Sequence, residues 1–250
     1  MPFTDAELLL LQTAESTNLS AINLLKSANL PEGSLIYTYN QTHGKGQGNN
    51  HWESQPGKNI TASAVLYPDF LKAEQQFMLT KIVALSVCSL LKTYGLPFQP
   101  EIKWPNDIYI NDRKIAGILI NNEVSGNYIT RTVAGLGLNV NQTAFKKYTP
   151  PAISLKMLTG SDAPLQKVLT DWHIQLGYWY DLLMQSKNEV IDKAYLERFY
   201  RLNQTTMYII RDELKEATIT GLADYGMLRL IDKEGSVITC GLHEIRFLHS

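Results

Sequence analysis

Three apolar segments between Glu101 and Asn141 constrain the fold of this chain most strongly. They cover 108–110, 115–123 and 128–140, and turn sequences at 111–112 and 125–127 separate them. Strand-forming runs joined by turns of two or three residues indicate antiparallel hairpins. The segment therefore predicts an antiparallel meander.

Helices and further strands are expected on both sides of the meander. Apolar residues repeat there at helical spacing in three long stretches and form short runs of strand type in two others. In chain order these are strands over 34–39 and 60–67, and helices over 73–94, 165–184 and 190–201. A mixed, largely antiparallel sheet with helices packed on it places the chain in the α+β class.

The two ends of the chain have different patterns. Residues 8–14 are apolar enough for a buried strand or a short helix, and periodicity does not decide between them. The Ser-Thr-Asn run at 16–18 predicts a helix start, because such side chains accept hydrogen bonds from the first N–H groups of a helix. Residues 207–247 are short strands and turns. We therefore expect an α+β domain over 1–203 and a small β-barrel domain over 204–250.

Composition and charge argue against several functional classes. The 250-residue chain has 23 Lys and Arg against 24 Asp and Glu, so its net charge of −1 provides no general attraction to nucleic acid or to anionic membranes. The N-terminal segment has neither a cationic start nor a long apolar run, so we expect a cytoplasmic protein. Cys88 and Cys240 are the two cysteines, and we expect them to be buried and reduced.

A glycine-rich loop with the sequence GKGQG at 44–48 follows the strand at 34–39. Glycine permits positive φ and lets backbone N–H groups turn toward an anion, and Lys45 adds a positive charge. The spacing differs from that of a P-loop, and the loop leads to Trp52 and a strand rather than into a helix. An anion-binding loop and a solvated turn both remain open.

The sequence KWPND at 103–107, followed by Lys114, forms a second cationic element. The proline ends any helix and restricts the tryptophan before it to an extended conformation. Lys103 and Asp107 are therefore expected at strand ends, where their side chains reach into a cleft. Together with the glycine loop, this element predicts a site for an anionic nucleotide.

The turn at 111–112 decides whether Asp107 and Lys114 meet. A two-residue turn, at 111–112 or at 112–113, would place both on one face of the sheet together with Tyr109 and Ala116, and an odd-length loop would separate them. The alternative to a functional pair is a surface ion pair that contributes only ~0–1 kcal/mol. The flanking strands are too apolar for a hairpin with one fully exposed face.

Glycines alternate at Gly135 and Gly137 in the last segment of the meander, ahead of Asn139 and Asn141. A strand that lacks side chains at alternate positions leaves room for a ligand or for a neighbouring backbone. The two asparagines are able to bond a phosphate, a sugar or a metal-bound water. Close packing of the strand on a helix explains the glycines equally well.

Taken together, these motifs resemble those of biotin–protein ligases in order and approximate spacing. The resemblance covers nearly the whole chain, and the C-terminal β segment is similar to the SH3-like tail of that family. The matching segments are STN at 16–18, QTHGKGQ at 41–47 with Trp52, KWPND at 103–107, KIAGIL at 114–119 and GLGLN at 135–139. The resemblance implies the biotin–lipoate ligase fold, which is similar to that of class II synthetases.

Such ligases join biotin to ATP, release pyrophosphate, and pass the biotinyl group from biotinyl-5′-AMP to a lysine of a biotin carboxyl carrier protein. The resemblance implies that Lys114 and Lys45 are catalytic, because a carboxylate and a polyphosphate must meet between cations. It also implies Mg²⁺, held by Asp107. The implied biotin contacts are Ser16, Thr17, Asn18, Gln41, Lys45, Gly46, Gln47, Lys114 and Gly117. The implied ATP and adenylate contacts are Lys45, Gln47, Trp52, Asn106, Asp107 and Asn139.

Two features depart from the family pattern. The glycine loop of these ligases often carries several arginines, whereas Lys45 is followed here by uncharged residues, so we expect faster release of activated biotin and some promiscuous labelling. Ser16 already belongs to the ligase pattern, so we expect no DNA-binding segment before it and no repressor activity.

Two rival functions stay open from the sequence. Lipoate–protein ligases share the fold and the adenylate chemistry, and a non-catalytic module would bind biotin or a nucleotide without turning it over. The presence of both Asp107 and Lys114 weighs against the module. Edge strands of the meander could pair with a carrier strand or with a second copy of the chain, as in a homodimer.

Overall fold

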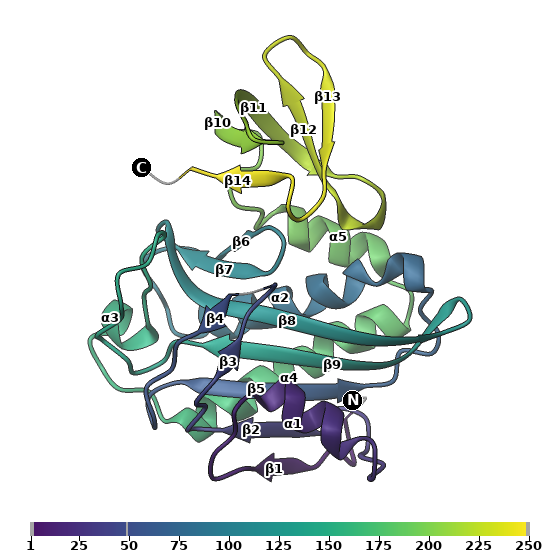
Figure 1. Ribbon diagram of the computed structural model, residues 1–250. Coiled ribbons are helices and arrows are strands. Elements are labelled where there is room, and N and C mark those ends of the chain that lie inside the picture. Colours follow the sequence, from purple (N-terminus) through teal and green to yellow (C-terminus); the bar gives the residue numbers. More distant parts are fainter. Residues whose placement is uncertain (1–2, 49, 249–250) are drawn as a thin grey trace.

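The computed structural model describes residues 3–48 and 50–248, which form a large sheet backed by helices and a smaller C-terminal sheet (Figure 1). The strands of the large sheet are β1 (Leu8–Leu10), β2 (Leu35–Thr38), β5 (Ile60–Leu66), β6 (Glu101–Lys103), β7 (Asp107–Ile110), β8 (Arg113–Ser125) and β9 (Tyr128–Leu138). Their order is β1-β2-β5-β9-β8-β7-β6, and only the β1–β2 pair is parallel. The α+β class and the antiparallel meander are confirmed.

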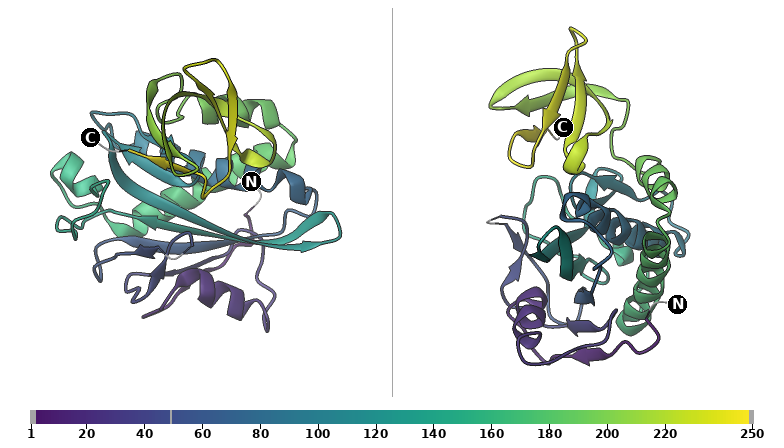
Figure 2. Two further views of the ribbon diagram at one scale, coloured as in Figure 1. Left: turned by 45° about the horizontal axis from the view of Figure 1, so that its top comes forward. Right: turned by 90° about the vertical axis from the view of Figure 1, so that its right-hand side faces the viewer.

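Helices cover both faces of this sheet. On one face lie α2 (Phe77–Lys92) and α4 (Leu165–Met184), which are joined by a hydrogen bond of 2.9 Å from Trp172 Nε1 to Ser86 Oγ. On the other face lies α1 (Thr17–Leu24) (Figure 2). It packs on buried strand residues such as Ile36 and Val65. The segment at 8–14, for which a strand and a short helix were both open, begins with strand β1 and contains no helix. Among the described residues, no helix has the length and apolarity to cross a membrane.

All three predicted helices are present, and two of them have altered limits. The helix over 165–184 has the predicted ends, whereas the one over 73–94 divides into a 3-10 turn (Ala73–Gln75) and α2. The last one, α5 (Asn188–Leu196), ends five residues early, because residues 198–200 bond to β6 instead. A short helix, α3 (Leu155–Thr159), was not predicted, since five residues are too few to show a period.

One edge of the meander is covered by another segment of the chain. Of the meander strands, β6 stands at the end of the sheet order, and the chain at 198–200 covers it. Ile102 N donates to Arg198 O at 2.7 Å, and Tyr200 N donates to Ile102 O at 3.0 Å. β7 pairs with β8 only as far as Gly117, so among the described residues no strand lies on the outer edge of β8 over 119–125. The expectation that meander edge strands pair with another chain stays a prediction. The other edge strand is β1, where Leu8 and Leu10 are exposed.

The C-terminal sheet is antiparallel and has the order β13-β12-β11-β10-β14. Its strands are β10 (Thr205–Ile210), β11 (Glu213–Leu222), β12 (Leu228–Asp232), β13 (Val237–Cys240) and β14 (Ile245–Phe247). Five short antiparallel strands are consistent with an SH3-like fold. The buried side chains Tyr208, Leu228 and Cys240 belong to the same apolar cluster as α2. The division of the chain at 203 and 204 therefore stays a prediction.

Both cysteines have the predicted state. Cys88 in α2 and Cys240 in β13 are buried and free. Burial raises the pKa of the Cys88 thiol to about 12. Each thus packs as a small apolar residue.

Candidate active site

A cavity of about 690 Å³ lies where the start of α1, the glycine hairpin and strands β7 to β9 meet. The segment at 145–152 and the turn between β13 and β14 complete its wall. Every residue that the sequence assigned to biotin, ATP or catalysis lines this cavity: Ser16, Thr17, Asn18, Gln41, Lys45, Gly46, Gln47, Trp52, Asn106, Asp107, Lys114, Gly117 and Asn139. The structure brings these residues together, and their individual roles stay predictions.

Asp107 and Lys114 form an ion pair in the wall of the cavity. Lys114 Nζ lies 2.6 Å from Asp107 Oδ1, and the side chains are 31% and 16% exposed. The turn between β7 and β8 has two residues, Asn111 and Asp112, with φ of 50° and 58°. These positive values are those of a type I′ turn, which matches the twist of a hairpin. The pair is thus half-buried inside a cavity and is not an ordinary surface ion pair.

The predicted face of this hairpin is correct for Tyr109 and wrong for Ala116. Tyr109 lies opposite Lys114, but the register shifts at the next pair, so that Ala116 lies opposite Ile108 and Gly117 opposite Asp107. One extra residue in β8 forms a β-bulge, and such a bulge reverses the alternation beyond it. Ala116 is therefore buried in the core. Gly117 takes the place on the face of Asp107 that was predicted for Ala116, and it lines the cavity.

Two side chains occupy the space above the alternating glycines of β9. A Cβ atom at Gly135 would lie 2.1 Å from Asn18 Oδ1, and one at Gly137 would lie 2.3 Å from the Trp52 ring. Close packing of a helix residue on the strand therefore explains Gly135. At Gly137 the space holds an indole ring, whose Nε1 is buried without a hydrogen-bond partner among the described residues.

The start of α1 forms a polar part of the cavity, although not by the predicted capping. The Ser16 side chain makes no capping hydrogen bond, and Thr17 N donates instead to Gln41 Oε1 at 2.9 Å. Ser63 Oγ lies 2.9 Å from Thr17 Oγ1 and 2.6 Å from Asn18 Oδ1. A tertiary contact thus satisfies the helix N-terminus, and the Ser16 hydroxyl is not used for it.

The glycine loop is a small hairpin of β3 (Gly44–Lys45) and β4 (His51–Trp52). Of its glycines, Gly48 has a positive φ of 62°, whereas Gly46 N donates across the hairpin to Asn50 O at 2.7 Å. The expectation that the Gly46 N–H turns toward an anion is therefore corrected, because the hairpin uses this donor. Lys45 is exposed at the cavity wall.

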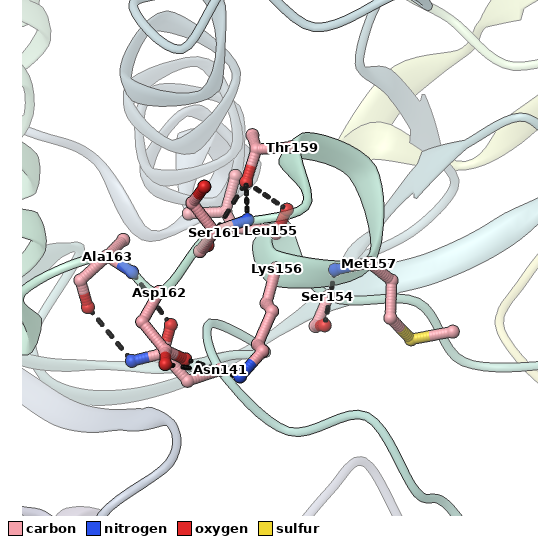
Figure 3. Close-up of polar contacts among 9 residues, drawn as sticks. All are labelled: Asn141, Ser154, Leu155, Lys156, Met157, Thr159, Ser161, Asp162 and Ala163. Atoms are coloured by element: carbon pink, nitrogen blue, oxygen red, sulfur yellow. Dashed lines mark hydrogen bonds and ion pairs between the residues drawn. The ribbon is translucent and has the colours of Figure 1, made fainter.

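The two asparagines after β9 have different positions, and Figure 3 shows the contacts of Asn141. Asn141 Nδ2 donates to Ala163 O at 2.9 Å, and Ala163 N donates to Asn141 Oδ1 at 2.9 Å, so Asn141 serves the chain itself and does not line the cavity. Its expected contact with a ligand is corrected. Asn139 lines the cavity and donates to Ile153 O at 3.0 Å, which holds the segment before α3 at the wall.

The charged side chains of the wall are mostly cationic. Four lysines line the cavity, Lys45, Lys103, Lys114 and Lys146, against the carboxylates of Glu53 and Asp107. Burial lowers the pKa of Lys103, which the nearby Lys114 ammonium lowers further and Asp107 raises. An excess of cations in a concave, partly desolvated wall favours an anionic ligand.

Residues 10–139 match the model of the biotin/lipoate A/B protein ligase family. The match covers more than half of the 250-residue chain. The chain belongs to the biotin/lipoate A/B protein ligase family. This result confirms the resemblance on which the sequence motifs were interpreted, and the cavity described above is formed largely by the matched residues.

Two relatives and one solved structure extend the family match. The bifunctional ligase/repressor BirA of Bacillus spizizenii is 34% identical over 134 residues, which are 54% of this chain and 41% of that protein. The biotin–[acetyl-CoA-carboxylase] ligase of Paracoccus denitrificans is 27% identical over 243 residues, 93% of each chain. A structure of the Aquifex aeolicus biotin protein ligase in complex with biotin and ATP has a TM-score of 0.79 at 24% identity, over 98% of this chain and 99% of that one. The chain thus spans less than half of the Bacillus protein and shares its fold with the Aquifex enzyme.

Several cavity residues of this family member were not predicted as site residues. They are Glu53, Lys103, Phe145, Lys146, Tyr148, Leu242 and His243. Glu53 accepts hydrogen bonds from Tyr148 Oη at 2.7 Å and from Lys146 N at 3.3 Å. Burial and this carboxylate raise the pKa of Tyr148 to about 12. Lys103 was visible as a cation of the KWPND motif, whereas the others carry no local signal, because tertiary packing alone brings them to the cavity.

Proposed function

We propose that this protein is an ATP-dependent biotin–protein ligase that forms biotinyl-5′-AMP and transfers the biotinyl group to a lysine of a biotin carboxyl carrier protein. The observation that carries the proposal is the convergence of Lys45 and Lys114 on one cavity, with Asp107 at 2.6 Å from Lys114. The family match supports it, as does the Paracoccus ligase, which is similar over 93% of both chains.

In the first step a carboxylate oxygen of biotin attacks the α-phosphorus of ATP, and the bond from that phosphorus to pyrophosphate breaks. Negative charge gathers on the phosphoryl oxygens in the transition state. A preorganised cation at that place lowers the barrier, since it does not need to reorganise. We assign this role to Lys114, because its ion pair with Asp107 holds the ammonium in the cavity wall. Lys45 in the hairpin would hold the adenylate.

The neutral biotin head group needs paired donors and acceptors in a partly apolar setting. We assign it to the polar start of α1, where Thr17 N donates to Gln41 Oε1 and where Asn18 also lines the cavity. The buried Trp52 Nε1 lacks a partner among the described residues, and a ligand acceptor would satisfy it. Stacking of adenine on Trp52 stays part of the proposal.

Mg²⁺ would accompany the polyphosphate of ATP. Such Mg²⁺ ions take one or two protein carboxylates and complete their shell with phosphate oxygens and water. Asp107 in the cavity wall fits this requirement, with Asn106 and Asn139 beside it in the lining. The ion neutralises phosphate charge when bound.

In the second step the neutral amine of the carrier lysine attacks the biotinyl carbonyl carbon, and AMP leaves. No side chain of this protein forms a covalent intermediate. Biotinyl-5′-AMP is a mixed anhydride that water hydrolyses. The glycine hairpin and the segment at 145–152, which line the cavity, would exclude water from it. A cytoplasmic location, where carrier proteins with acceptor lysines are made, completes the proposal.

The proposal is tested by incubating the protein with biotin, MgATP and a biotin carboxyl carrier domain, followed by mass spectrometry of the carrier. The carrier should gain one biotinyl group, and Lys114→Ala should lower the rate by at least about 100-fold, the usual effect of removing one transition-state donor. Lys193→Ala, at an exposed position of α5 outside the cavity, is the folded control. Lipoate in place of biotin should give no added mass. Modification by lipoate alone would refute the assignment.

The arginine-poor loop leads to a second measurable property. Lysine does not hold a phosphate through a bidentate fork, so biotinyl-5′-AMP should dissociate faster than from a ligase with an arginine-rich loop. Gln47→Arg places a guanidinium in the cavity lining and should slow dissociation about tenfold, which stopped-flow fluorescence would measure. An unchanged rate would contradict this explanation.

A further inference from the structure

Lys103 is a half-buried cation that the proposed chemistry has not used. It ends β6, lines the cavity, and lies opposite Asp107 in the β6–β7 register. Asp107 is paired with Lys114, and among the described residues no carboxylate oxygen lies within 4.0 Å of the Lys103 ammonium. A half-buried cation without a counterion is costly in the free protein. It would be stabilised when an anion enters the cavity.

An aromatic ring of the C-terminal sheet lies next to this ammonium. Lys103 Nζ lies 4.7 Å from the centroid of the Phe247 ring in β14. This distance is within the range of a cation–π interaction, which strengthens where water is excluded. Phe247 is itself held by Tyr208 in β10, with ring centroids 5.3 Å apart and planes at 88°. An aromatic ring attracts the ammonium without neutralising it, so the charge stays available to a ligand.

The same sheet also forms part of the cavity wall. Leu242 and His243, in the turn between β13 and β14, line the cavity together with Lys103. Lys103 therefore adds a positive charge to the part of the cavity wall that lies between the Asp107–Lys114 pair and the C-terminal sheet. A triphosphate is the larger anion of the two substrates in the proposed reaction, and it needs more than one cation.

We propose that Phe247 is a positioning residue that holds Lys103 in the cavity, and that Lys103 contacts the polyphosphate of ATP. This inference rests on the proposed function. It makes nucleotide binding dependent on one aromatic side chain of the C-terminal sheet. Phe247 acts through Lys103 and touches no reacting atom.

The test measures biotin-dependent exchange of labelled pyrophosphate into ATP, with separate KM values for ATP and biotin. Phe247→Leu keeps an apolar side chain and removes the ring. It should raise KM for ATP about tenfold, and leave kcat and KM for biotin within about twofold. Phe247→Tyr keeps the ring and should restore the wild-type KM. Phe70→Leu is the matched control, since that ring packs on Tyr180 and does not line the cavity.

A double-mutant cycle separates positioning from a loss of packing. If Phe247 acts through Lys103, Phe247→Leu should change KM for ATP no further in a Lys103→Met background. Additive effects, or equal effects of Phe247→Leu and Phe70→Leu, would overturn the inference. If Phe247→Leu has a lowered Tm, Lys103→Met by itself provides the test and must raise KM for ATP. An unchanged KM for ATP in Lys103→Met would overturn the inference. A wild type without exchange activity would overturn the proposed function and this inference together, whereas an active wild type with unaffected variants would overturn the inference alone.

Discussion

At the scale of single residues, the shape of the cavity depends on two glycines that leave space for neighbouring side chains. Gly135 admits Asn18, and Gly137 admits the Trp52 ring. Asn18 Nδ2 donates to Leu119 O and to Asn121 Oδ1, both at 2.9 Å, so its side chain is held from two sides. A polar side chain fixed in this way cannot move aside at low cost.

Gly135→Ala should therefore lower the free energy of unfolding by about 1–3 kcal/mol, the usual cost of overpacking a rigid site. The added methyl would lie 2.1 Å from Asn18 Oδ1. Urea-induced unfolding measures the change. Gly241→Ala is the control, because its nearest neighbour is Glu244 Oε2 at 3.5 Å, and it should change the free energy by less than about 0.5 kcal/mol. Equal effects at the two positions would show that Asn18 is free to move.

At the scale of elements, Glu53 joins two segments that are distant in sequence. It directly follows β4 and accepts hydrogen bonds from Gln142 Nε2 at 3.2 Å, Lys146 N at 3.3 Å and Tyr148 Oη at 2.7 Å. Both segments line the cavity. Movement of the hairpin is thereby coupled to movement of the segment after β9.

Glu53→Ala should release the segment at 142–148 and expose the peptide bonds after Lys146 and Lys147 to trypsin. The loss of several hydrogen bonds lowers the cost of local opening, so cleavage there should be about tenfold faster. Limited proteolysis with mass spectrometry of the peptides measures the rate. Tyr148→Phe removes one of the bonds and should have a smaller effect. Unchanged cleavage in Glu53→Ala would mean that other contacts hold the segment.

At the scale of the whole molecule, the C-terminal sheet is joined to the large sheet by core contacts. Trp104 Nε1, in the KWPND motif, donates to Gly226 O at 2.8 Å. A Cβ atom at Gly226 would lie 2.1 Å from the Phe77 ring of α2. The buried residues of both sheets form one apolar cluster. The segment at 204–250 is thus expected to unfold together with the rest of the chain.

Calorimetry should show one thermal transition for the wild-type protein. Trp104→Phe removes the hydrogen bond to Gly226 and part of a buried ring, and should lower the free energy of unfolding by about 1–3 kcal/mol without dividing the transition. Two separate transitions, with the earlier one assigned to the strands over 205–247, would instead support an independent C-terminal domain.

Much of the fold could be predicted because its elements have local patterns. The helix over 165–184 has its predicted limits, and the turn at 111–112 has the two residues that the pattern indicated. The wrong predictions concern places where distant segments of the chain provide hydrogen-bond partners for backbone groups. Residues 198–200 leave the helical pattern to cover β6, and the helix start at Thr17 takes its acceptor from Gln41. Such competition has no periodicity in the sequence.

The sequence by itself determined the class of the fold, the glycine-rich loop and the KWPND–lysine element, because turns, periods and motifs are local properties of the chain. Tertiary structure alone decided that Ala116 faces the core, that Trp52 covers Gly137, and that the turn at 242–243 reaches the cavity. A bulge of one residue and contacts between segments more than 80 residues apart set these positions. Both depend on which groups satisfy each other in the packed molecule, and spacing along the chain does not record that choice.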